Sequence, residues 1–178
     1  MIYVLLTDGF EEIEALTPVD IMRRGELEVR TVSVTGNLQV TGSHGIPVIA
    51  DMDIEEVNPG NMEMLILPGG PGHTGLDCNK KVHELIDYAS ENDIFIAAIC
   101  ASPSIIGRKG LLKGKKATAF PGFEQYLYDA EVLKDKVVMD GRFITAKGAG
   151  ASAEFGFMIV SVLLGENKAN ELRESMQY

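Results

Sequence analysis

The stretch from Ile94 to Pro103 (IFIAAICASP) constrains the fold of this chain more than any other. Its first six residues are apolar, with no polar alternation, which is typical of a strand buried on both faces of a parallel sheet. Cys100 interrupts the run, and Pro103 is a residue that helices accept in their first turn. The stretch therefore predicts that Cys100 lies on a sharp strand-to-helix turn at the carboxyl edge of a sheet.

The residues around Cys100 are small enough for such a turn. Ala98 and Ser102 stand two positions before and after it, as in a nucleophile elbow, where the cramped backbone requires small neighbours. A thiol at this place lies close to the first N–H groups of the following helix, which favour thiolate over thiol. A buried structural cysteine is the alternative, because cysteine is among the most frequently buried residue types. The residues alone leave both interpretations open.

Strands and helices alternate along the rest of the chain. This order predicts an α/β fold with a doubly wound, mostly parallel sheet sandwiched by helices, and we expect one domain spanning residues 1–178. Glycines and a proline within residues 39–50 favour a short edge hairpin there. The expected strands cover residues 2–6, 28–34, 64–67, 94–99 and 116–119, with a hairpin at 137–145, and the expected helices cover 11–24, 79–92, 152–164 and 168–176.

Charge and cysteine content narrow the class of protein. The formal net charge of −10 argues against a nucleic-acid partner, since binding to a phosphate backbone relies on clustered lysine and arginine. Two cysteines without a CxxC pair cannot build a disulfide framework, and no basic leader precedes the first strand, so we expect a cytoplasmic protein. The longest apolar runs are too short to cross a bilayer, and we expect no membrane partner.

Three loops are expected to meet at the carboxyl edge of the sheet, where ligands bind in folds of this class. They cover residues 7–14, 68–75 and 100–103. In the second loop, Gly69 and Gly70 allow the backbone to approach closely enough to offer N–H donors. Together with the N–H of Ala101, these donors could form an oxyanion hole.

An acid in the first loop could reach the thiol. A partly buried carboxyl at Glu14 would have a raised pKa, would remain protonated and could donate to a thiolate. A solvated carboxylate that complements the helix dipole is the alternative, and it suits Glu11 and Glu12 well. The residues alone do not single out Glu14 from these two.

Two further motifs carry less weight. Residues 70–75 formally match a dinucleotide fingerprint, but the acid expected about 20 residues later is missing at the end of the next strand, so we expect no cofactor. His73 in this loop and His44 in the edge hairpin are candidate acid–base or substrate contacts. Without an HxH, HExxH or Cys/His cluster, no metal site is expected.

Three segments together resemble a known family. They are residues 11–20 (EEIEALTPVD), residues 67–70 (LPGG) and residues 97–103 (AAICASP), and the similarity continues through 147–155. The chain resembles the PfpI/ThiJ superfamily, in its DJ-one (parkinsonism-associated deglycase) branch. The resemblance implies a flavodoxin-like sandwich, a homodimer, and an elbow cysteine at Cys100 whose depressed pKa is accompanied by a bonded, protonated Glu14. Oxyanion donors would correspond to Gly70 and Ala101.

The resemblance also implies an activity, with two departures. Members of this branch convert methylglyoxal or glyoxal to hydroxy acids without a cofactor, repair early glycation adducts, and are attributed oxidative-stress sensing and chaperone roles. Proteases of the family place a histidine directly after the nucleophile, where this chain has Ala101, so a Cys-His protease is not expected. Phe120 stands where many relatives carry another histidine, which removes an obvious proton shuttle. The leading hypothesis is an enzyme acting on small aldehydes or glycated substrates, and the alternative is a non-enzymatic redox sensor or protective module.

Overall fold

The computed structural model describes residues 1–178 and is built on one seven-stranded sheet. The strand order is β10-β11-β7-β6-β1-β2-β5, and all neighbours run parallel except β10 and β11. The mostly parallel, doubly wound sheet predicted from the sequence is therefore confirmed. The strands are β1 (Ile2–Leu6), β2 (Val29–Ser33), β5 (Met52–Asp53), β6 (Met64–Leu67), β7 (Phe95–Ile99), β10 (Val137–Asp140) and β11 (Phe143–Ala146).

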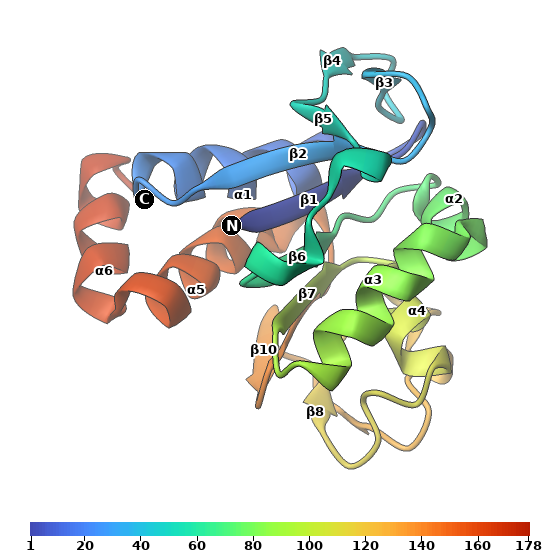
Figure 1. The fold of residues 1–178 in the computed structure, drawn as a ribbon. Coiled ribbons are helices and arrows are strands. Elements are labelled where there is room, and N and C mark those ends of the chain that lie inside the picture. Colours follow the sequence, from blue (N-terminus) through green and yellow to red (C-terminus); the bar gives the residue numbers. More distant parts are fainter.

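Helices cover both faces of this sheet (Figure 1). On one face, α1, α5 and α6 enclose a core of 23 buried residues, and on the other α2, α3 and α4 pack over a second core of 22. Successive residues of the central strands β1, β6 and β7 contribute to opposite cores, as the two-residue period of a strand requires. The helices are α1 (Glu12–Arg24), α2 (His73–Cys78), α3 (Lys80–Glu91), α4 (Pro103–Arg108), α5 (Ser152–Leu164) and α6 (Glu166–Ser175).

The remaining elements are short. The predicted edge hairpin is confirmed as β3 (Gln39–Thr41) and β4 (Pro47–Ile49), and the strand expected at 116–119 is reduced to β8 (Lys116–Ala117), paired with β9 (Glu131–Val132). Sequence reasoning missed α2, because its glycine-rich start suggested a loop. It also missed β5 and β9, which have only two residues each and carry no readable period. No helix has both the length and the apolar content that crossing a membrane requires.

Close packing of α1 against α5 sets the position of the first loop. Gly156 in α5 faces Pro18 and Ile21, and a Cβ at Gly156 would stand 3.2 Å from the Pro18 Cα. The missing side chain therefore allows the two helices to approach each other. Because α1 is held in this way, its first turn is directed at the carboxyl edge of β1, β6 and β7.

Candidate active site

Cys100 occupies the sharp turn between β7 and α4. Its φ of +66° lies in the left-handed region, which a non-glycine residue adopts only when its surroundings hold it there. Its N–H donates to the carbonyl of Ala146 at 2.8 Å, and its carbonyl accepts the N–H of Phe120 at 2.8 Å. The predicted strand-to-helix turn is thus confirmed, and both backbone groups of the cysteine are held by neighbouring segments.

The loop after β6 lies directly against this turn. The Ser102 hydroxyl donates to the carbonyl of Pro68 at 2.5 Å, a contact that sequence reasoning missed when it valued Ser102 only for its size. A Cβ at Gly69 would lie 2.4 Å from the Cys100 Cβ, and one at Gly70 would lie 2.6 Å from the Glu11 nitrogen. Only residues without a side chain fit between the turn and the first loop.

Glu14 is the acid that reaches the thiol. Its side chain is buried, with 2 % of the residue exposed, and it is hydrogen-bonded to the Cys100 thiol. Its Oε2 also accepts the N–H of Gly69 at 3.1 Å, and the N–H of Ala149 donates to the same carboxyl. The position of the carboxyl is therefore set by three elements that meet at one edge of the sheet.

Burial, together with the charge of a neighbouring carboxylate, raises the pKa of both groups; this carboxylate is Glu11 for Glu14 and Glu14 for Cys100. Burial raises the pKa of Glu14 to about 7, although its hydrogen bond with Cys100 opposes the shift. Burial, followed by the charge of the Glu14 carboxylate, raises the pKa of the Cys100 thiol to about 12. The expected depression of the thiol pKa is therefore wrong for the state in which Glu14 is ionised. That expectation rested on the helix N-terminus, which contributes less here than burial and the adjacent carboxylate.

The expected N–H donors divide into two groups. The N–H groups of Gly70 and Ala101 hydrogen-bond the Cys100 sulfur and lower its pKa, so they lie where negative charge would develop on a bound substrate. The N–H of Gly69 is instead engaged by Glu14, which differs from the oxyanion role expected for it. Gly69 therefore positions the carboxyl, whereas Gly70 and Ala101 face the thiol.

A cavity of about 220 Å³ opens over Cys100. Phe120, Phe123 and His73 are among its lining residues, and His73 packs edge-on against Phe123 with ring centroids 5.1 Å apart. The Nδ1 atom of His73 donates to the carbonyl of Gly70 at 2.9 Å, which leaves Nε2 as the nitrogen available to accept a proton. Of the two candidate histidines, the structure places only His73 at this cavity.

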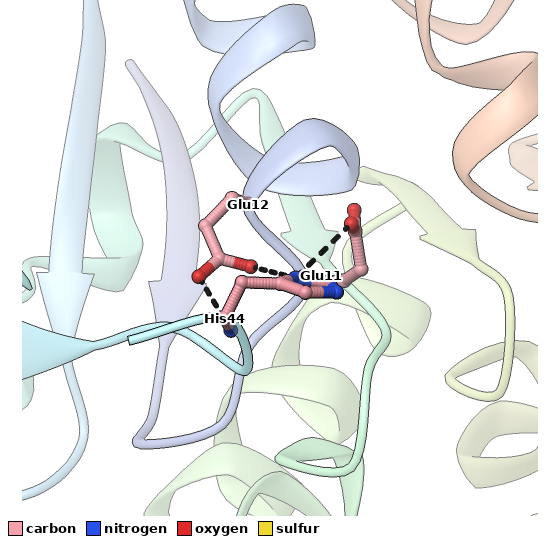
Figure 2. Close-up of side chains that lie close together, drawn as sticks. All are labelled: Glu11, Glu12 and His44. Atoms are coloured by element: carbon pink, nitrogen blue, oxygen red, sulfur yellow. Dashed lines mark hydrogen bonds and ion pairs between the residues drawn. The ribbon is translucent and has the colours of Figure 1, made fainter. Parts of the chain in front are cut away.

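His44 lies against the first turn of α1 (Figure 2), and it is not among the residues that line the cavity. Its Nδ1 is 2.8 Å from Glu12 Oε2, and its backbone N–H donates to Glu12 Oε1 at 2.8 Å. Burial alone would raise the pKa of Glu12, but these hydrogen bonds outweigh burial and lower it to about 2. The hydrogen bond between the two side chains also raises the pKa of His44. Sequence reasoning missed this pairing because the two residues are 32 positions apart.

Atoms of Glu11, Glu12 and His44 that could each bind a metal ion lie within 4.8 Å of one another. Hydrogen bonds explain this arrangement, since one Glu11 oxygen caps the N–H of Glu14 at 2.8 Å and Glu12 accepts bonds from Ser43 and His44. We therefore assign no metal ion to this group.

Comparisons with known proteins agree with the fold and with the family that the sequence resembles. The DJ-1/PfpI family model matches residues 1–162. The chain is 34 % identical over 98 % of its length to Protein DJ-1 homolog B of Arabidopsis thaliana, but it spans only 40 % of that protein. It is 30 % identical over 84 % of its length to a protein of Pyrococcus abyssi named a deglycase, and covers 90 % of it.

A solved structure supports the same relationship. The crystal structure of a cysteine-to-alanine mutant of a DJ-1 superfamily protein from Salmonella typhimurium superposes with a TM-score of 0.94 at 30 % identity. The match covers 99 % of this chain and 97 % of the other. The flavodoxin-like α/β arrangement implied by the sequence is thereby confirmed.

Proposed function

This chain belongs to the DJ-1/PfpI family, and we propose that it is a cofactor-independent enzyme that converts small 2-oxoaldehydes such as methylglyoxal into 2-hydroxy acids. The observation that supports this most strongly is the hydrogen bond between the Cys100 thiol and the buried Glu14 carboxyl. A nucleophile beside an acid–base group is the pair that addition to an aldehyde followed by proton transfer requires.

The first step is addition. The Glu14 carboxylate takes the thiol proton as the Cys100 sulfur attacks the aldehyde carbon, which gives a hemithioacetal. The N–H groups of Gly70 and Ala101, which bond the sulfur in the resting site, stabilise the negative charge that develops on the aldehyde oxygen. Proton transfer from Glu14 to this oxygen completes the step.

The second step is an internal redox rearrangement. Glu14 removes the hydrogen from the former aldehyde carbon and returns a proton to the neighbouring carbonyl carbon, through an enediol. The product is a thioester of lactate on Cys100, and water then hydrolyses it to lactate and the free thiol. Overall, methylglyoxal and one water give lactate, with no external oxidant or reductant. A pKa of about 7 suits Glu14 to both acceptance and donation of the proton.

Related activities fit the same site to different degrees. Release of early glycation adducts would use the same thiol and carboxyl. An enzyme with either activity is a lyase or a hydrolase, and we propose that it acts against carbonyl stress in a reducing cytoplasm. A Cys-His protease does not fit, because Ala101 follows the nucleophile. A non-enzymatic redox sensor is the second candidate function, since the two N–H donors at Sγ could hold the oxygens of a sulfinate.

Lactate formation from methylglyoxal tests the proposal. The wild-type protein is expected to give many lactate molecules per chain, whereas Cys100→Ala is expected to give none above the spontaneous background. Product must be measured, because methylglyoxal is also lost by simple trapping on thiols and amines. Cys78→Ala is the matched control, since this second cysteine is exposed and lies outside the cavity, and it should retain the wild-type rate.

Two results would contradict the enzyme. Lactate no higher than in Cys100→Ala would exclude turnover. If Cys100 then also reacts with limiting peroxide well before Cys78, the redox sensor becomes the supported function.

We also propose that two copies of the chain associate through the face formed by α1 and the β3–β4 hairpin. Ile13, Ile46 and Ile49 are 53 %, 52 % and 67 % exposed there. The hairpin is fixed beside α1 because the Ser43 N–H donates to the Phe10 carbonyl at 2.7 Å. Apolar side chains exposed together are typical of an interface.

Sedimentation equilibrium is expected to give twice the chain mass of 19.3 kDa. Ile49→Lys should shift the protein towards the monomer, because it places an ammonium group in the apolar contact. Val132→Lys is the matched control, since Val132 is a similarly exposed apolar residue on β9. A wild-type monomer at micromolar concentration would contradict the association.

A further inference from the structure

We propose that Phe120 and Phe123 make the site selective for 2-oxoaldehydes that carry a flat apolar substituent, with an aryl group preferred over methyl and over polyhydroxylated chains. This inference rests on the proposed function and specifies its substrate class. Phe120 stands in place of the family histidine, so the side chain at this position offers no proton and presents an apolar ring to the cavity.

The two phenylalanines belong to the same wall of the cavity. Phe120 is 46 % exposed, and its backbone N–H is bonded to the carbonyl of Cys100, so its ring is held close to the nucleophile while one side remains open. Phe123 follows in the same turn, where its N–H donates to the Phe120 carbonyl at 2.9 Å, and its ring contacts His73. Pro71 contributes further apolar surface to the cavity.

The size of the cavity matches a small ring. About 220 Å³ is below the roughly 300–1,000 Å³ typical of sites for drug-sized ligands, so one ring beside the dicarbonyl group is a suitable occupant. Aromatic side chains prefer to contact another ring edge to face or offset, and each such pair stabilises by more than the burial of its area alone. A methyl group in the same place makes neither contact.

The cavity offers few hydrogen-bond partners to polyhydroxylated substituents. Apart from Cys100, His73 is the only lining residue with a polar side chain, and its Nδ1 is already bonded to Gly70. Sugar-like hydroxyls that enter this cavity would lose their water without gaining partners, which is unfavourable.

The decisive quantity is the ratio of kcat/KM for phenylglyoxal to that for methylglyoxal, with mandelate and lactate measured as products. Each rate is divided by the equilibrium constant for hemithioacetal formation with 2-mercaptoethanol, which removes the intrinsic difference between the aldehydes. We expect the wild-type ratio to favour phenylglyoxal at least about tenfold. Phe120→Ala should lower the ratio about two- to tenfold, and Phe120→Leu by less, because each ring contact contributes a factor of this size.

Controls separate the inference from general damage and from the proposed function. Tyr128→Ala removes an exposed aromatic residue outside the cavity and should leave the ratio unchanged. Hemithioacetal formation is also measured on Glu14→Gln, where turnover is blocked and only binding to the thiol remains.

An aryl preference in hemithioacetal formation without any product would support the inference and contradict the proposed function. Product formation with equal ratios in wild type and Phe120→Ala would overturn the inference and leave the function intact.

Discussion

Glu14→Gln is expected to lower lactate formation about 10²- to 10⁴-fold, the range that a positioned acid–base group contributes. Glutamine keeps the shape of the side chain and its hydrogen bond from Gly69, but it can neither accept the thiol proton nor carry one between the two substrate carbons. Hemithioacetal should still form on Cys100 at equilibrium, because the cavity is unchanged, but it should form more slowly, because the thiol has lost its base. Glu91→Gln, at the exposed end of α3, is the matched control and should retain full activity.

The same substitution should change the pH dependence of the thiol. Below about pH 7, Glu14 and Cys100 each hold a proton, and as the pH rises through the Glu14 pKa of about 7 the pair loses one of them. Alkylation of Cys100 by iodoacetamide should therefore accelerate through neutral pH in the wild type. In Glu14→Gln this step should disappear, and the rate should rise only near the thiol pKa, which burial keeps high.

One outcome would contradict this assignment. A wild-type alkylation rate that is already constant from about pH 5 to pH 8 would mean that the N–H groups of Gly70 and Ala101 stabilise the thiolate at low pH without help from the carboxylate. Alkylation of Cys78 in the same samples provides the reference for an exposed thiol.

Gly69→Ala should remove activity and reduce stability together. The new Cβ would lie 2.4 Å from the Cys100 Cβ, 2.4 Å from Glu14 Oε2 and 2.9 Å from the carbonyl oxygen of Ile99. The backbone carbonyl has little room to move, so the turn and the carboxyl must separate. We expect lactate formation at the level of Cys100→Ala, and a loss of about 1–3 kcal/mol in the free energy of unfolding, as for other overpacked sites.

Chemical denaturation and the lactate assay measure both effects. Gly60→Ala is the control, because a Cβ at Gly60 would meet only the Asn58 side chain, at 3.3 Å, in the turn that precedes β6, whereas Gly69 follows that strand. Wild-type turnover in Gly69→Ala would show that Cys100 and Glu14 do not need to stay in contact for the reaction.

The elbow could be predicted from the sequence because its signal is local. The apolar run before Cys100, the small Ala98 and Ser102, and Pro103 lie within a few residues of one another, and each restricts the same turn. The order of strands and helices could be predicted for the same reason, because apolar runs and hydrophobic periods also extend over only a few residues. The helix α5, which was predicted from its long apolar stretch, has the bounds that the structure shows.

The choice among the three glutamates could not be read from the same evidence. Consecutive residues of a helix point about 100° apart, so the rotation of α1 decides which acid faces Cys100. A signal was available: Glu14 shares its face with Pro18 and Ile21, four and seven positions later, and both are buried. Glu12 required a partner from a distant hairpin, His44, and no local pattern indicates that contact.

The direction of the thiol pKa was wrong for a physical reason. A position at a helix N-terminus suggested a stabilised thiolate, yet α4 has only six residues, and the opposing contribution comes from burial and from Glu14, which lies 86 positions earlier in the chain. The direction in which the pKa of a buried group shifts depends on neighbouring groups that only the fold brings together.

The hydrogen bonds that hold the Cys100 turn also determine at which point of synthesis the site around the thiol can form. Its backbone is bonded to Phe120 and Ala146, and Glu14 is bonded to Ala149, so these partners all follow the cysteine in the chain. A nascent chain that ends shortly after α4 has the nucleophile and the acid but none of these three contacts. The segments that complete the site therefore leave the ribosome after the cysteine does. The site around the sulfur can form only when nearly the whole domain is able to fold.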